Sequence, residues 1–342
     1  MTLRYEIRAA LPADEDQLLE VAHHLDTVNL PDDRGAIREI LATSLGSFDG
    51  TITDLRRREY VFVLRDVEAD RVIGTSMVIA QLGRRDAPYI YYDVIEEERY
   101  SASLDKHFHH TVLRIGYSYN GPTEIGGLIL LPDYRRVPER LGQFLSYVRF
   151  LYIAAHRELF RDVVLAELLP PLEADGTSHL WEALGRKFTD MTYGEADVLS
   201  KKNKEFIKQL FPEGAIYASL LEPRAQAAIG KVGAQTKGVE KLLRRIGFRY
   251  AHRVDPFDGG PHFDAPVDEI SLVRKTHRGA AAVSAEVASK GLVAVEAPGP
   301  PFFRAVLGRF EQGPAGAALV APEVAEHLGL REGQGVITLP LE

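Results

Sequence analysis

Three arginines stand in a short turn between an apolar strand and a long helix. Arg135, Arg136 and Arg140 lie in this turn, after the apolar run 124–131 and before the helical stretch 141–160. A helix N-terminus presents backbone N–H groups to an anion, and guanidinium groups add charge-assisted hydrogen bonds. The pattern predicts a site for a phosphorylated ligand; the alternative is that these arginines are simply solvated.

Side chains that can transfer a proton are spread along the chain. Glu167 lies near the end of an apolar strand predicted at 162–169, and His109 and His110 lie in a region without a clear pattern. A positioned acid or base typically accelerates a reaction by roughly 10²–10⁴-fold. We treat all three as catalytic candidates, with a salt bridge as the alternative role for Glu167.

Composition limits the other kinds of chemistry. The 342 residues contain no cysteine, which excludes disulfides, thiolate catalysis and cysteine-bound zinc, and we expect no metal site. A formal net charge of −8 argues against nucleic-acid binding. No apolar run approaches the length of a membrane span, and the N-terminus lacks the apolar core of a signal peptide. We therefore expect a cytoplasmic location and no membrane contact.

The elements that position these side chains alternate between strands and helices. The order of strand, basic turn, helix and strand over 124–169 is typical of a parallel crossover unit, whose helix N-terminus faces ligands in α/β folds. Gly247 follows the last predicted helix and is a good C-terminal residue for it. Apolar periodicity predicts strands at 5–8, 60–65, 72–80, 124–131, 162–169 and 248–254, and helices at 36–45, 141–160 and 239–246.

Short motifs spaced along the chain, together with this order of elements, carry a family resemblance. The motifs lie at 60–64, 131–135, 150–154, 181–185, 196–200, 228–232, 257–261, 303–307 and 328–330. They resemble the arginine N-succinyltransferase family of GNAT-type acyltransferases. The resemblance implies an α/β (α+β) fold with a GNAT-like mixed central sheet flanked by helices, duplicated or extended. It places an acyltransferase domain at 1–275, with its donor site at 124–160, and a small β-rich C-terminal extension at 276–342.

The resemblance also implies an activity. Members of the family move an acyl group from acyl-CoA to an amino group of arginine or a related amine. We expect acyl-CoA, as succinyl-CoA or another acyl-CoA, to act as a co-substrate rather than a permanently bound cofactor. The expected partners are this donor, a small-molecule amine and further chains in a homo- or hetero-oligomer. An acyl carrier protein in place of CoA is a further alternative.

The implied donor site combines backbone groups of a strand with the basic turn. A family leucine that contacts succinyl-CoA corresponds to Leu128, although the apolar strand can equally serve as buried core. The turn is about two residues longer than the family's glycine-rich turn, and only one glycine remains in it. The predicted donor-binding residues are Leu128, Ile129, Leu130, Arg135, Arg136, Arg140, Gly142 and Gln143.

The chain departs from the family pattern at functional positions. Gly233 stands where the family has a proton-donating histidine, so it is not itself catalytic, whereas Glu167 matches a family glutamate and ranks first among the catalytic candidates. Near Tyr91, Asp93 replaces an arginine, and Ser101 replaces a histidine. We regard these three as substrate-binding candidates and hypothesise that Asp93 repels a succinyl carboxylate. The alternative is a catalytically weakened or non-catalytic subunit of the same family.

Overall fold

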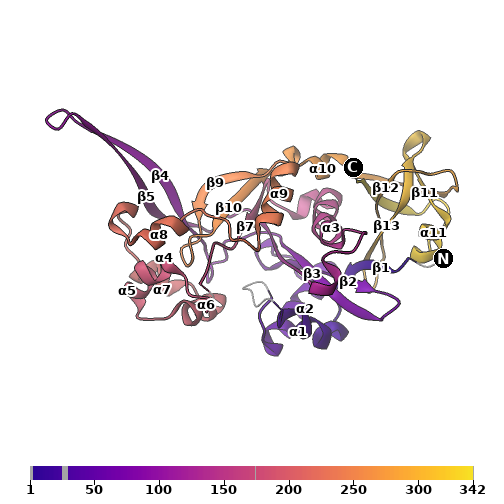
Figure 1. Cartoon of the computed structure of the whole chain (residues 1–342). Helices are drawn as coiled ribbons and strands as arrows, with labels where there is room; N and C mark the ends of the chain where they lie inside the picture. Colours follow the sequence, from indigo (N-terminus) through magenta and orange to yellow (C-terminus); the bar gives the residue numbers. More distant parts are fainter. Residues whose placement is uncertain (1–2, 25–29, 174, 342) are drawn as a thin grey trace. The chain divides into compact units, whose positions relative to one another are not determined.

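The computed structural model describes residues 3–24, 30–173 and 175–341, which fall into two compact units (Figure 1). The first unit comprises 1–81, 123–162 and 267–342, and the second comprises 82–122 and 163–266. Each unit is built from separated stretches of chain. The described helices include none that is both long and apolar enough to cross a membrane.

The first unit is built on a mixed sheet with helices packed against it. Hydrogen-bonded strand order is β12 (Lys290–Glu296), β15 (Gly335–Pro340), β11 (His277–Val283), β14 (Ala317–Val320), β13 (Phe303–Gln312), β1 (Tyr5–Ala9), β2 (Glu59–Asp66), β3 (Arg71–Ile79) and β6 (Thr123–Leu130). Pairing of β12 with β13 closes the first five strands into a small barrel. The helices are α1 (Glu15–Ala22), α2 (Arg34–Phe48), α3 (Leu141–Ala155), α10 (Ser271–Lys275) and α11 (Pro322–Leu328).

The predicted elements of this unit form for local reasons that the structure shows. The side chain of Asp33 caps α2 by accepting a hydrogen bond from the Ala36 N–H at 2.7 Å. Helix α3 is almost wholly buried, which explains its apolar sequence. It ends at Ala155, before the predicted end at 160, because His156 leaves the helical conformation and pairs with Glu296.

The second unit has its own sheet. Its strand order is β7 (Val163–Glu167), β10 (Pro261–Pro266), β9 (Arg249–Val254), β4 (Tyr89–Ser101), β5 (Lys106–Ser118) and β8 (Ile216–Tyr217). Its helices are α4 (His179–Ala183), α5 (Gly185–Thr189), α6 (Tyr193–Lys202), α7 (Glu205–Leu210), α8 (Pro223–Ala228) and α9 (Lys237–Ile246). Gly247 ends α9 with φ of 118°, as its position predicted. The sequence did not predict β4, β5 or β10.

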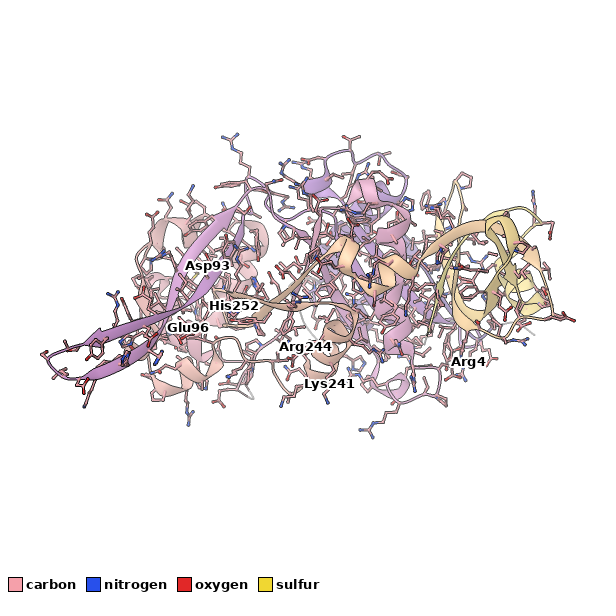
Figure 2. All side chains as sticks on the ribbon, turned by 90° about the horizontal axis from the view of Figure 1, so that it is seen from above. Arg4, Asp93, Glu96, Lys241, Arg244 and His252 are labelled. Carbon is pink, nitrogen blue, oxygen red and sulfur yellow. The ribbon has the colours of Figure 1, made fainter. Side chains whose placement is uncertain are left out.

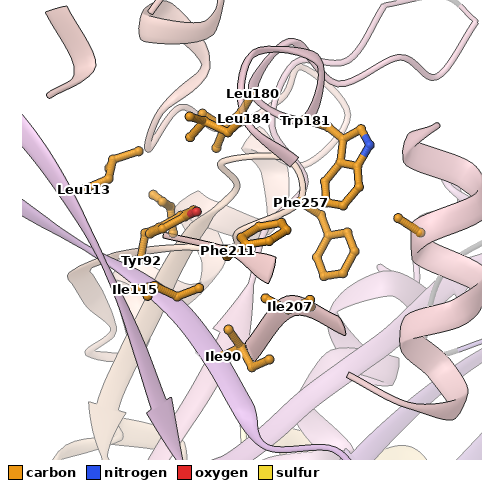
Figure 3. Close-up of a cluster of buried hydrophobic side chains, with 12 residues drawn as sticks. Ile90, Tyr92, Leu113, Ile115, Leu180, Trp181, Leu184, Ile207, Phe211 and Phe257 are labelled. Carbon is orange, nitrogen blue, oxygen red and sulfur yellow. The ribbon is translucent and has the colours of Figure 1, made fainter. Parts of the chain in front are cut away.

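The core of the second unit joins its helices to its sheet. The ring of Trp181 stacks on that of Phe257, with centroids 5.0 Å apart and planes at 4°. Tyr92, Leu113 and Phe211 belong to the same cluster of buried side chains (Figure 3). From this core, β4 and β5 continue as a long two-stranded ribbon that projects from the second unit (Figure 1). The fold class is thus confirmed: mixed sheets are flanked by helices.

Candidate functional site

Strand β6 carries a bulge at the predicted donor-binding residues. The register between β3 and β6 shifts there, so that Ser76 alone faces two residues, Gly127 and Leu128. Gly127 has φ of 55°, a left-handed conformation that favours glycine. A bulge leaves backbone groups outside the regular ladder, and bulges are common beside active sites. The chain next to Leu128 therefore has the kind of backbone irregularity that can hydrogen-bond an extended ligand.

A buried arginine fixes this bulge to α3. Arg149 is only 2% exposed, and its guanidinium donates to the Gly126 carbonyl at 3.4 Å and to the Ser146 Oγ at 2.8 Å. Burial lowers the pKa of Arg149 to about 9. A second tie runs from the Ser76 Oγ to the Leu145 carbonyl at 2.9 Å. These bonds hold the bulge in one conformation.

The three arginines of the basic turn are all exposed, and one of them also makes a structural hydrogen bond. Arg135 donates from Nε to the Leu130 carbonyl at 2.8 Å, which ties the turn to the end of β6. Arg136 and Arg140 are exposed. Arg140 is the residue before α3 and has φ of 55°; among the described residues, no side chain caps this helix N-terminus. The first turn of α3 therefore presents N–H groups beside the exposed guanidinium groups of Arg136 and Arg140, a combination suited to phosphate.

A pocket of about 270 Å³ opens at this helix end. Two predicted donor-binding residues, Arg140 and Gln143, line it, and Lys290 of β12 adds a positive charge that sequence reasoning missed. Gly142 lies in the same first turn and is half-buried, whereas Ile129 and Leu130 are buried core. The remaining lining residues are Pro138, Glu139, Phe144, Leu307 and Leu341.

Glu167 lies in the second unit, opposite a histidine that the sequence did not single out. Glu167 and His262 are direct partners in the pairing of β7 with β10. The His262 Nε2 lies 3.4 Å from the Glu167 Oε1, and its Nδ1 is 2.9 Å from the Tyr89 hydroxyl. His262 is fully buried, whereas Glu167 is exposed at the end of its strand. An imidazole and a carboxylate thus meet at the C-terminal end of β7.

The imidazole of His262 is held in its neutral form. Burial, and then the positive charges of Arg253 and Lys204, lower the pKa of His262 to about 3. A carboxylate oxygen of Asp255 belongs to the same cluster: it and the nearest ligand atoms of Glu167 and His262 all lie within 4.8 Å of one another. A neutral nitrogen between two carboxyl groups can accept a proton or a hydrogen bond.

The family-like motif at 257–261 shapes this cluster. Asp255 Oδ1 accepts hydrogen bonds from the N–H groups of Phe257 at 2.7 Å and Asp258 at 3.3 Å, which closes a tight loop. A Cβ on Gly260 would stand 2.5 Å from the Leu168 carbonyl oxygen, so only glycine fits there. Burial, and then the charge of Asp255, raise the pKa of Asp258 well above its usual value. The motif therefore packs the loop against the end of β7.

Gly233 lies beside the same strand end and has no room for a side chain. Its N–H donates to the Leu169 carbonyl at 2.8 Å. A Cβ on Gly233 would stand 2.6 Å from the Pro170 carbonyl oxygen and 2.9 Å from that of Leu169, closer than real Cβ contacts. A histidine at this position would require the backbone to move.

Asp93 is not the lone anion that the sequence suggested. The Arg253 Nε donates to its Oδ1 at 2.9 Å, and the Arg253 guanidinium lies 3.8 Å from the centre of the Tyr91 ring. Asp93 projects from the base of the β4–β5 ribbon, close to β9 (Figure 2). The cation that the family pattern has at position 93 is thus replaced by an ion pair, whose charges balance.

The structure does not bring the other three candidates to this cluster. Ser101 lies further out on the ribbon than Asp93 by roughly 27 Å, at about 3.4 Å per residue, and its hydroxyl contacts Ser103 at 3.2 Å. His109 stands 3.9 Å from Glu98, and His110 contacts the Ser219 hydroxyl at 3.4 Å, on the same ribbon. They lie apart from the cluster because β4 and β5 continue past the sheet as a hairpin, and their expected catalytic and substrate-binding roles stay predictions.

His262 could have been noticed in the sequence only through its position. It follows the motif 257–261 directly. Its meaning depends on the pairing of β10 with β7, which joins residues almost a hundred positions apart. No periodicity predicted the short strand β10, so this histidine remained outside the candidates.

Comparisons with known proteins agree with this fold. A family model described as arginine N-succinyltransferase beta subunit matches residues 5–272. An arginine N-succinyltransferase of Enterobacter sp. (strain 638) is 34% identical over 249 residues, covering 72% of this chain and 71% of the relative. One from Salmonella paratyphi B is 32% identical over 273 residues, covering 79% and 78%.

A solved structure extends the similarity over both units. Arginine/ornithine succinyltransferase subunit AI from Pseudomonas aeruginosa has a TM-score of 0.83 to this chain and 27% identity, and the match covers 98% of each chain. The predicted family is thereby confirmed. The chain belongs to the arginine N-succinyltransferase family and is an acyltransferase.

Proposed function

We propose that this chain transfers an acyl group from acyl-CoA to the amino group of arginine or a related small amine. The observation that carries the proposal is the donor half: the β6 bulge next to Leu128, followed by the N-terminus of α3 with the exposed Arg136 and Arg140. Backbone groups at a bulge suit the amide-rich pantetheine arm, and the helix end with its arginines suits the phosphates.

The choice of acyl-CoA donor should depend on Asp93, which stands where the family pattern has an arginine. A succinyl carboxylate near this position would meet the balanced pair of Asp93 and Arg253 rather than a free cation. We propose that the chain does not prefer succinyl-CoA. The test compares turnover with acetyl-, succinyl- and longer acyl-CoA, each with arginine, ornithine and lysine, by mass spectrometry of the acylated amine. Fastest turnover with succinyl-CoA would contradict this preference.

A second candidate is a catalytically weakened subunit that works beside a competent chain. It is favoured by Gly233, which lacks the family's imidazole and is closed in by the carbonyl oxygens of Leu169 and Pro170. Thermal shift with acyl-CoA separates binding from turnover, because a ligand of the folded state stabilises it in proportion to its concentration. Stabilisation together with turnover supports the enzyme; stabilisation without turnover by the isolated chain supports the subunit.

A further inference from the structure

A buried nitrogen of the second unit has no hydrogen-bond partner within the described part of the chain. It is the Nε2 of His262, whose side chain is fully buried; among the described residues nothing satisfies it, although the Glu167 Oε1 lies 3.4 Å away. Leaving a buried polar atom unsatisfied costs about 1–3 kcal/mol, so such an atom in a folded protein calls for a reason.

The surrounding structure fixes the orientation of the His262 imidazole and therefore the position of its Nε2. The Tyr89 hydroxyl holds Nδ1 at 2.9 Å, and the two rings stack with centroids 5.8 Å apart. Opposite His262, the register of β9 against β10 shifts between Pro261 and Phe263, and His252 in this irregular stretch has φ of 54°. A bulge with a left-handed residue other than glycine is strained, and such features gather at functional sites.

The cluster has the composition and size of an ammonium site. A primary ammonium has three N–H donors. Acceptors placed 2.9 Å from one tetrahedral nitrogen stand about 4.7 Å apart, and the ligand atoms of Glu167, Asp255 and His262 all lie within 4.8 Å of one another. Arg253 and Lys204 already place positive charge near His262. That charge disfavours a divalent ion more strongly than a singly charged ammonium.

We propose that Glu167, Asp255 and His262 form the subsite for the ammonium group of the acceptor, and that the His262 Nε2 accepts a hydrogen bond from this nitrogen and orients it for acylation. The inference rests on the proposed function. Tyr89 acts as a positioning residue, because its hydroxyl fixes the imidazole through the nitrogen that faces away from Glu167.

The reaction requires two proton losses from the acceptor nitrogen. The ammonium first loses one proton to water through the exposed Glu167. The neutral amine then attacks the thioester carbon: an N–C bond forms, the C–S bond breaks, and the second proton passes to the departing thiolate. The products are the amide, the free thiol of CoA and one released proton. The imidazole of His262 is neutral at working pH, so its Nε2 can accept the hydrogen bond that orients the acceptor nitrogen.

The decisive variant is His262→Asn. Asparagine keeps a polar atom near the position of Nδ1 for the Tyr89 hydroxyl but removes Nε2. We expect kcat to fall by roughly 10²-fold, because loss of this hydrogen bond misplaces the attacking nitrogen, and we expect the KM for the amine to rise. The charged and titratable groups that face His262 are Tyr89, Glu167, Lys204, Arg253 and Asp255. The matched control is His327→Asn, since His327 is also a buried histidine but both its nitrogens have partners.

Binding is measured separately by calorimetry with L-arginine and with arginine whose amino group is acetylated. The subsite is supported if arginine binds, acetylated arginine does not, and His262→Asn binds arginine more weakly than the wild type. This result can be obtained even without turnover, so failure of the proposed function is distinguishable from failure of this inference. Full activity of His262→Asn would overturn the role of Nε2. Equal binding of the acetylated compound would overturn the subsite, as would activity that a chelator abolishes and a divalent metal restores.

Discussion

The donor half and the acid–base cluster differ in what they are made of. The donor half is one contiguous stretch, β6, turn and α3, and it relies on backbone groups and exposed positive charge. The acid–base cluster combines side chains of β4, β7, β10 and the loop after β9, and its central imidazole is buried and neutral. Binding in the donor half is compatible with a longer turn and with Pro138, because many backbone groups share the contacts. The chemistry of the acid–base cluster depends on individual side-chain atoms. Substitutions should therefore affect turnover far more in the cluster than in the turn.

Among the remaining substitutions, the largest effect is expected at Glu167. In Glu167→Gln, kcat should fall by about 10²-fold, because the amide can still accept a hydrogen bond but cannot carry a proton to water. Thermal stability should change little, since the side chain is exposed. Steady-state kinetics beside the exposed Glu222→Gln of the same unit measure this difference. Equal kcat in both variants would remove Glu167 from the reaction.

The next effect concerns packing at the end of β7. Gly233→Ala should destabilise the fold by about 1–3 kcal/mol, because its Cβ would press on two carbonyl oxygens. The same substitution at Gly238 of α9 meets open space and should stabilise by up to about 1 kcal/mol. Urea denaturation compares the two. On the same grounds Gly233→His should not gain activity; a gain would show that the backbone yields there.

A pH effect on stability should follow from His262. Its pKa is about 3 in the folded chain, below the ordinary value near 6.5, so the unfolded chain binds the proton first as pH falls. The stabilisation is present above pH 6.5 and is lost as pH falls toward 3. Between pH 6.5 and 5.5 the wild type should lose about 1 kcal/mol more than His262→Asn. Parallel losses in denaturant titrations would mean that His262 is not held neutral by the fold.

The smallest effect is expected in the turn. The double charge reversal Arg136→Glu with Arg140→Glu should raise the Kd for acyl-CoA by about 10-fold, because exposed charge-assisted bonds contribute modestly. The control reverses Arg56 and Arg57, tandem arginines of another turn in the same unit. Calorimetry with CoA provides the measurement. A loss of kcat with unchanged Kd would contradict the assignment of this turn to donor binding.

The two regions also differ in how far the sequence predicted them. The order of strand, basic turn and helix was visible because its signals are local: apolar runs, three arginines and one long helical period. The bulge at Gly127 was not visible, since it depends on the register against β3. His262 was missed because a six-residue strand has little periodicity and its partner Glu167 is distant in sequence. The pairing of Asp93 with Arg253 was hidden for the same reason.

The central claim is that this chain acylates an amine from acyl-CoA, and release of CoA tests it most directly. The chain contains no cysteine, so a thiol-reactive dye reports free CoA without a background from the protein. The purified chain is mixed with acetyl-, succinyl- and longer acyl-CoA, each with and without arginine or ornithine. We predict thiol release that requires both an acyl-CoA and an amine and that falls sharply in His262→Asn. Release that no amine accelerates, with every donor, would contradict the account.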